Sequence, residues 1–153
     1  MEIGDKLKDL EFKIDDSNII KNSELTSKYT IIYFYPKDDT PGCTKEAIDF
    51  SSKIEILKKN DISIYGISKD SSEKHMKFIN KHDLKFDLIT DESGHLCEKF
   101  NVWVEKSMYG KKYMGIQRAT FLIDSNQTII NVWRNVKVKN HADEVLNFIL
   151  GLN

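Results

Sequence analysis

The chain is poor in the features that mark several classes of protein. It has only two cysteines, Cys43 and Cys97, so it lacks the disulfide framework of small secreted proteins. No apolar run approaches the roughly 18 residues that a membrane helix needs. The N-terminal residues lack the charged-then-apolar pattern of a signal peptide, and no repeat, low-complexity tract or linker is present. We therefore expect a single cytoplasmic domain over residues 1–153.

Excess charge of one sign is also missing. The formal net charge is −1, which gives no indication of electrostatic capture by nucleic acid or by an anionic membrane. Arginine is scarce, because Arg118 and Arg134 are the only two among 23 basic residues. In so lysine-rich a chain, an arginine beside an apolar segment needs a reason. The seven glycines form no phosphate-binding or dinucleotide-binding motif.

The apolar pattern predicts strands alternating with helices. An almost unbroken apolar run over 30–36 suits a central strand covered on both faces, and 105–115 is expected to be a loop or insertion. The resulting class is α/β, a thioredoxin-like fold with a mixed central sheet flanked by helices and an N-terminal β extension. The other predicted strands are 10–14, 18–22, 62–68, 86–90, 118–124 and 127–134, and the predicted helices are 40–59, 71–82 (with apolar Met76 and Ile79), 93–100 and 141–150.

Cys43 directly follows a Thr-Pro-Gly turn at the start of a predicted helix. Thr40 suits the N-cap and Pro41 the first helical position, where a missing N–H costs nothing. Cys43 then falls in the first turn, where free N–H groups and the positive end of the helix dipole favour an anion. A cysteine in such a setting is favoured as the reactive thiolate. The same pattern also fits a small buried thiol behind a helix cap, so local physics leaves both interpretations open.

A wider resemblance decides between them. The segment FYPKDDTPGCTKE resembles the active-site segment of peroxiredoxins, with the proline, threonine and cysteine of that pattern at Pro36, Thr40 and Cys43. The full sequence of this segment resembles that of the bacterioferritin comigratory protein (PrxQ) subfamily. The similarity in order and spacing covers nearly the whole chain. It includes CEKFNVW, EKSMYGKKYMGIQRATFLID and NHADEVLNFI.

The resemblance implies a thioredoxin-dependent type of thiol peroxidase, acting on hydrogen peroxide and organic hydroperoxides without a metal or an organic cofactor. Cys43 would be the nucleophile that becomes a sulfenic acid. Thr40 and Arg118 would orient and polarise the peroxide, since the transition state needs preorganised donors, and Pro36 would shield the thiolate. Glu46 is a candidate to orient Arg118 by an ion pair, with an exposed helix carboxylate as the alternative.

The sequence departs from the subfamily at the resolving position. Many members carry a second cysteine five residues after the first, where this chain has Ile48. Cys97 is the only internal candidate, but its apolar neighbours favour a buried, inert thiol, and a bridge to Cys43 would require Cα atoms within about 7 Å. We therefore expect a one-cysteine cycle resolved by an external thiol. The expected partners are a thioredoxin-like or small-thiol reductant, and the expected state is a monomer or weak homodimer.

Three other functions fit the sequence less well. A disulfide oxidoreductase would want Cys-x-x-Cys, which is absent after Cys43. A Cys–His hydrolase would need a histidine directed at Cys43, and no local feature provides one. The histidines make no metal-ligand spacing with either cysteine, and His75 and His82 are expected to be solvated. A peroxide sensor or redox-gated binding protein using the same activated thiol is the more serious rival.

Overall fold

The computed structural model describes residues 1–152. Its main sheet has five strands in the order β5-β4-β3-β8-β9. β3 runs parallel to β4 and antiparallel to β8, so the sheet is mixed as predicted. The strands of this sheet are β3 (Tyr29–Phe34), β4 (Ile62–Ser68), β5 (Asp87–Thr90), β8 (Ala119–Asp124) and β9 (Ile129–Trp133).

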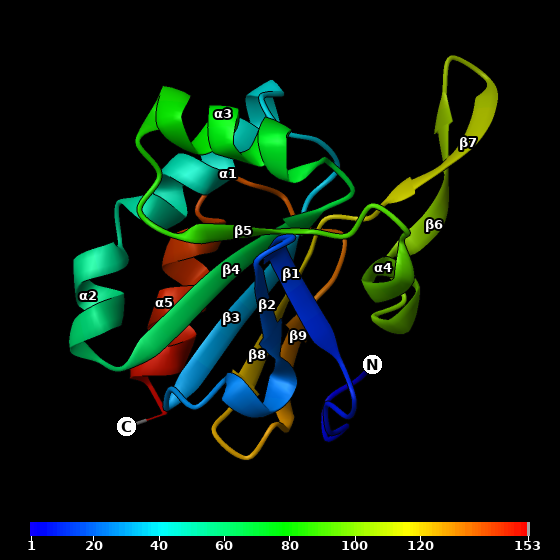
Figure 1. Cartoon of the computed structure of the whole chain (residues 1–153). Coiled ribbons are helices and arrows are strands. Elements are labelled where there is room, and N and C mark those ends of the chain that lie inside the picture. The colour runs from blue at the N-terminus through cyan, green and yellow to red at the C-terminus, as the bar shows by residue number, and fades with distance from the viewer. Residues whose placement is uncertain (153) are drawn as a thin grey trace.

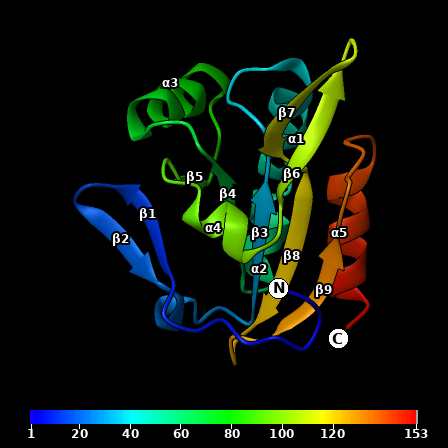
Figure 2. The ribbon, with the colours of Figure 1, turned by 90° about the vertical axis from the view of Figure 1, so that its right-hand side faces the viewer.

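Helices pack on both faces of the sheet, and the N-terminal hairpin lies beside it, as Figures 1 and 2 show. The N-terminal extension is the predicted pair β1 (Glu11–Asp15) and β2 (Asn18–Lys21), followed by the short 3-10 helix η1 (Asn22–Glu24). This arrangement confirms the predicted thioredoxin-like fold. The α-helices are α1 (Pro41–Ser51), α2 (Ile54–Lys59), α3 (Ser72–His82), α4 (His95–Lys99) and α5 (His141–Leu150).

The central strand β3 divides the core into two halves, because successive side chains point to opposite faces of a sheet. Ile31 and Tyr33 face a cluster shared with α1, α2, α3 and α5. Ile32 and Phe34 face a second cluster shared with β1 and α4. Gly66 of β4 permits this packing, since a Cβ there would lie 2.8 Å from atoms of the Tyr33 ring.

Two predicted segments differ from the structure. The single helix expected over 40–59 is interrupted at Ser52 and Lys53, which separate α1 from α2. The expected loop over 105–115 is instead a hairpin of β6 (Trp103–Met108) and β7 (Lys111–Ile116), which stands away from the main sheet.

The turn of this hairpin explains why apolar periodicity missed it. Tyr109 and Gly110 both have positive φ, as the two central residues of a type I′ turn require. The strands on either side are largely exposed and carry lysines, so they lack the buried apolar face on which strand prediction relies.

Of the two apolar residues that predicted helix α3, Ile79 packs against the core and Met76 does not. The apolar residue Met76 is 53% exposed, whereas His75 and Phe78 are buried. The prediction that His75 is solvated is therefore wrong. His82, two turns further along the same helix face, remains partly exposed.

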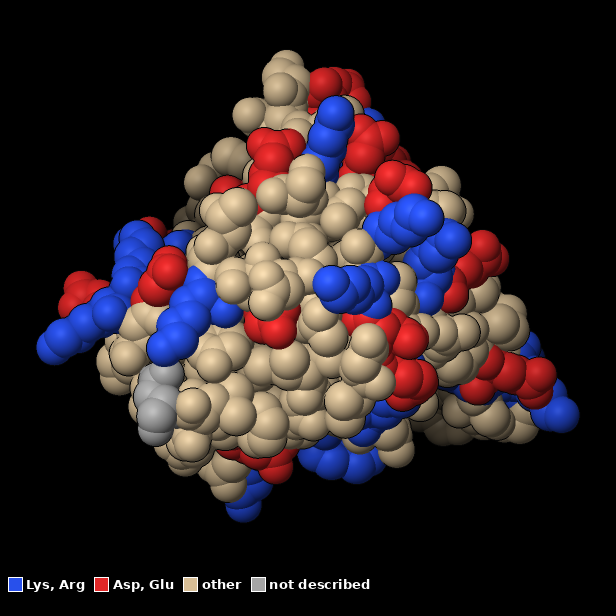
Figure 3. Space-filling view, turned by 90° about the horizontal axis from the view of Figure 1, so that it is seen from below, with Lys and Arg blue, Asp and Glu red and all other residues tan. Residues whose placement is uncertain are grey.

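The surface fits the balanced composition. On the face seen from below, Lys and Arg side chains are interspersed with Asp and Glu (Figure 3). Across residues 1–152, no helix combines the length and apolarity that crossing a membrane requires.

Candidate active site

The first turn of α1 presents Cys43 as the sequence predicts. Thr40 is the N-cap residue and Pro41 the first helical residue, so Cys43 is the third. The Thr44 N–H donates to the Thr40 carbonyl at 2.8 Å, which opens the helical ladder and leaves the N–H groups of Gly42 and Cys43 outside it. Cys43 itself is only 2% exposed, although Pro41 and Gly42 beside it are exposed.

Arg118 reaches this helix start from the sheet. It lies immediately before β8, whose Ala119 pairs with Phe34 at the end of β3. Its Nη2 donates to Cys43 Sγ at 3.3 Å, and its Nη1 donates to Glu46 Oε1 at 2.7 Å. The planar guanidinium therefore spans a thiol and a carboxylate at once, which a lysine ammonium could not do in the same way.

Gly42 leaves room for this approach. A Cβ at position 42 would lie 3.3 Å from Arg118 Nη2, closer than most side-chain contacts. The glycine of the Thr-Pro-Gly turn therefore leaves space for the Arg118 side chain, besides being part of the helix start.

Glu46 lies one turn after Cys43 and is buried rather than an exposed helix carboxylate. Burial raises its pKa to about 7 despite the opposing effect of the Arg118 guanidinium. Its Oε2 finds no hydrogen-bond partner among the described residues. The ion pair with Arg118 is the contact that the sequence suggested for this glutamate.

Thr40 and Pro36 flank the site in the segment between β3 and α1. The Thr40 hydroxyl donates to the Lys37 carbonyl at 2.9 Å and makes no capping bond to the helix. Its proton is thereby engaged, so toward a peroxide this hydroxyl oxygen is left as an acceptor. Pro36 is partly buried, two residues after the end of β3.

Cys97 lies on the other side of the sheet. It belongs to the core half that contains Phe100, whereas Cys43 belongs to the half with α1 and α5. Burial raises the pKa of the Cys97 thiol strongly, and the nearby Asp91 raises it further. Ile48, at the position of the missing resolving cysteine, is 43% exposed on α1.

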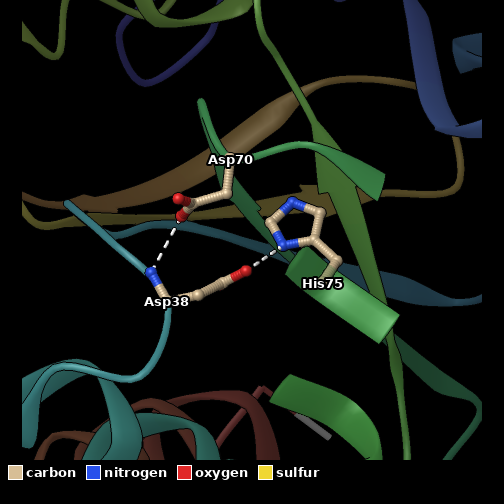
Figure 4. A group of neighbouring side chains, drawn as sticks. All are labelled: Asp38, Asp70 and His75. Carbon is tan, nitrogen blue, oxygen red and sulfur yellow. Dashed lines mark hydrogen bonds and ion pairs between the residues drawn. The ribbon is translucent and has the colours of Figure 1, made fainter. Parts of the chain in front are cut away.

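Sequence reasoning missed a buried polar cluster behind the active-site segment. Asp38, Asp70 and His75 approach one another where that segment meets α3 (Figure 4). The available signal was the pairing of His75 with Phe78 three residues later, which places the histidine on the apolar stripe of α3.

The chain matches known proteins over most of its length. The model of the AhpC/TSA family matches residues 3–132. Peroxiredoxin Bcp of Bacillus subtilis is 51% identical over 146 residues, which cover 95% of this chain and 93% of that protein. Peroxiredoxin Bcp of Escherichia coli is 38% identical over 149 residues, covering 97% and 96%.

Solved structures give the same result. The chain is similar to a PrxQ mutant structure from Xylella fastidiosa, with a TM-score of 0.93 and 36% identity over 99% of this chain and 96% of that one. It also resembles the bacterioferritin comigratory protein of Xanthomonas campestris, with a TM-score of 0.90 and 35% identity over 99% and 98%. With a helix-start cysteine held by an arginine on this fold, the chain belongs to the AhpC/TSA family and, within it, to the Bcp/PrxQ peroxiredoxins.

Proposed function

We propose that this peroxiredoxin reduces hydroperoxides through Cys43 and that an external thiol completes each cycle. The observation that carries the proposal is the Arg118 guanidinium, which holds Cys43 Sγ at 3.3 Å at a helix start. A cation and free N–H groups on one sulfur favour the thiolate, which is the attacking form of cysteine.

In the first step, the Cys43 thiolate attacks one oxygen of the peroxide. The sulfur–oxygen bond forms as the oxygen–oxygen bond breaks, sulfur is oxidised to sulfenic acid, and the alkoxide or hydroxide leaves and takes up a proton. Charge spreads over sulfur and both oxygens, so donors fixed in advance lower the barrier. Arg118 and the N–H groups of Gly42 and Cys43 are the donors in this proposal, and Thr40 accepts from the peroxide.

The remaining residues have supporting roles. Glu46 holds Arg118 through the 2.7 Å contact to Nη1, next to the Nη2 that donates to the sulfur. Pro36 shields the thiolate as part of the segment that closes the site. Both roles are consistent with the partial or complete burial of these residues.

In the second step, an external thiol attacks the Cys43 sulfenic acid, releases water and forms a mixed disulfide, which a second thiol then reduces. An internal disulfide is disfavoured, because Ile48 replaces the nearby cysteine and Cys97 packs in the opposite half of the core. The reductant is a thioredoxin-like protein or a small thiol, approaching over exposed Pro41 and Gly42.

Organic hydroperoxides belong among the proposed substrates. The Xanthomonas campestris bacterioferritin comigratory protein has alkyl peroxide reduction activity. The exposed helix start leaves an approach to Cys43 that is open to a substituent on the peroxide.

The test is intact mass after about one equivalent of hydrogen peroxide, with and without a sulfenic-acid trap. We expect one trap adduct, confined to Cys43, followed by steady turnover when a thiol reductant is supplied. Loss of two hydrogens without an adduct would show an internal disulfide to Cys97 instead. An adduct without turnover by any thiol would favour a single-use peroxide sensor, and an unchanged protein would refute the peroxidase proposal.

A further inference from the structure

The segment between β3 and α1 contains a buried acid that the proposed chemistry does not use. Asp38 is 5% exposed, whereas its neighbours Lys37 and Asp39 are exposed. A carboxylate buried within a loop is costly unless its charge and lone pairs are satisfied. Asp38 lies two residues before Thr40, so whatever satisfies it also fixes the approach to the active site.

The side chain of Asp38 is held at both carboxylate oxygens. Oδ1 accepts from the Tyr35 hydroxyl at 2.5 Å, and Oδ2 lies 2.6 Å from His75 Nδ1 (Figure 4). Its backbone N–H donates to Asp70 Oδ2 at 2.8 Å. One loop residue is thus tied to the end of β3, to α3 and to the turn that follows β4.

Both ring nitrogens of His75 make hydrogen bonds. Nε2 lies 3.0 Å from the carbonyl oxygen of Ile89, and a carbonyl can only accept, so this nitrogen carries a proton. Nδ1 lies 2.6 Å from Asp38 Oδ2, and Oδ1 of the same carboxyl already accepts from the Tyr35 hydroxyl, so a proton must lie between Nδ1 and Oδ2. The imidazole, only 2% exposed, therefore shares a proton with the Asp38 carboxyl, and in the ion pair this proton is on the imidazole.

Asp70 completes the cluster without leaving a place for an ion. Its Oδ1 pairs with Lys74 Nζ at 3.1 Å, and its Oδ2 also accepts from Ser68 Oγ at 2.7 Å. Every donor atom that could bind a metal is thus already engaged by a proton donor or acceptor of the protein. Such saturation fits a hydrogen-bonded cluster that holds the loop in place rather than a metal site. We call this cluster of Asp38, Asp70 and His75 the clamp.

The clamp acts on the active site through a short chain of contacts. Fixing Asp38 fixes the preceding peptide, including the Lys37 carbonyl to which the Thr40 hydroxyl donates. Asp39, between them, has a positive φ of 59°, a conformation that costs energy outside glycine and persists only when its surroundings enforce it. The clamp therefore determines where the Thr40 oxygen and the start of α1 lie.

We propose that His75 is a positioning residue for peroxide reduction: through its ion pair with Asp38 it fixes residues 36–40, so that Thr40 and the α1 N-terminus meet the peroxide at Cys43. This inference rests on the proposed function of Cys43. It assigns to α3, which contributes no group to the reacting atoms, control over the geometry of the site.

The experiment compares two reactions of the same thiol. The rate of Cys43 oxidation by hydrogen peroxide depends on donors and acceptors placed around two oxygens, whereas alkylation by iodoacetamide requires only the thiolate. The main variant is Asp38→Asn, which keeps the size of the side chain and removes its charge. His75→Gln is the second variant, in case the first does not fold.

We expect either variant to slow oxidation by about 10- to 100-fold, the range for small misplacements of reacting groups, while alkylation does not slow. The double variant should be no slower than the slower single variant, because both residues act through one contact. The matched control is Lys81→Met, which removes the exposed 2.8 Å contact of Lys81 to Asp39 on the same loop and helix. An exposed pair contributes little, so the control should oxidise at the wild-type rate.

The outcomes separate this inference from the proposed function. Unchanged oxidation in folded variants, or an equal loss of oxidation and alkylation, would overturn the positioning role. A wild-type protein that forms no sulfenic acid would instead overturn the proposed function. Independently of any variant, nitrogen-15 NMR of the His75 ring in the wild-type protein should show both nitrogens protonated, and a bare nitrogen would refute the clamp.

Discussion

The two cysteines occupy the same position in two different helices. Cys43 is the third residue of α1 after Thr40, and Cys97 is the third residue of α4 after Gly94. Both are buried, at 2% and 0% exposure. Helix position and burial therefore cannot explain why one is the proposed nucleophile and the other is not.

What differs is the group that meets each helix start. At α4, the carboxylate of Asp91 accepts from the N–H groups of Leu96 and Cys97, at 3.0 and 2.9 Å. The anion that a helix N-terminus attracts is thus already present, and it repels a second negative charge on sulfur. At α1 no side chain caps the helix, and the neighbouring group is the Arg118 cation. A helix start therefore activates a thiol only when no carboxylate already occupies the free N–H groups of its first turn.

The largest expected effect separates the two thiols directly. Cys43→Ser removes the nucleophile and should lower peroxide turnover by more than about a thousandfold, as loss of a catalytic nucleophile does. Cys97→Ser should leave turnover with a small thiol essentially unchanged, because that sulfur packs on the other side of the sheet. Steady-state peroxide consumption measures both. Loss of turnover in Cys97→Ser would identify Cys97 as the resolving thiol.

The next effect concerns the arginine beside Cys43. Arg118→Lys keeps a positive charge but loses the fork that spans Cys43 and Glu46. Loss of one preorganised donor typically costs about 100- to 1000-fold in rate, so oxidation of Cys43 by peroxide should slow by that factor. Rapid quenching followed by mass measurement gives the rate.

The other arginine offers the matched control. Arg134 donates to the backbone carbonyls of Met1, Phe100 and Asn101, and so holds the N-terminus against the core. Arg134→Lys should lower the free energy of unfolding by about 1–2 kcal/mol without slowing Cys43 oxidation. Equal slowing in the two lysine variants would mean that Arg118 acts through stability rather than at the sulfur.

Much of this contrast could be predicted from the sequence, because it depends on local signals. Thr-Pro-Gly before Cys43 indicates a helix start, and the apolar run before it indicates the central strand. The scarcity of arginine drew attention to Arg118 and Arg134, and the family resemblance assigned the site to Arg118. The Asp91 carboxylate was not foreseen, since nothing in the spacing of Asp91 and Cys97 shows that the carboxylate turns back onto the helix.

Contacts between distant segments set the limit of prediction. The Asp38–His75 pair joins residues 37 positions apart, and no local period reveals it. Counting Met76 as part of the apolar stripe of α3 concealed His75, because periodicity ranks residues by hydrophobicity and cannot see an ion pair. The β6–β7 hairpin was missed because its exposed strands need no apolar face.

The carboxyl group of Glu46, beside Cys43, provides a smaller, pH-dependent test. Burial raises the pKa of Glu46 from 4.5 to about 7, so between these values the folded chain keeps a proton that the unfolded chain has released. This group therefore makes the free energy of unfolding fall as pH rises through that window, by about 3 kcal/mol at most. Glu46→Gln removes this pH dependence of the unfolding free energy while keeping an oxygen that accepts from Arg118.

Urea unfolding at pH 5 and pH 8 measures the difference. Relative to the wild-type protein, Glu46→Gln should gain stability on going from pH 5 to pH 8. Glu55→Gln, at an exposed glutamate on α2, is the control and should show no such gain. If Glu46→Gln differs from the wild-type protein by the same amount at both pH values, the carboxyl is ionised throughout, and Arg118 outweighs burial.

The last test adds a thiol partner to Cys43 and should barely change its reaction with peroxide. Ile48 is 43% exposed, so Ile48→Cys is a surface substitution, expected to alter stability by less than about 0.5 kcal/mol. Five residues span roughly 7.5 Å along a helix, too far for a disulfide unless α1 unwinds.

If the sulfenic acid form lets α1 unwind, peroxide should produce loss of two hydrogens in Ile48→Cys in place of the trap adduct. Ile56→Cys, at an isoleucine of α2 that is 46% exposed, controls for an added thiol and should keep the adduct. Persistence of the adduct in Ile48→Cys would show that α1 stays folded after oxidation. The one-cysteine cycle would then follow from the rigidity of the helix start, and not only from the residue at position 48.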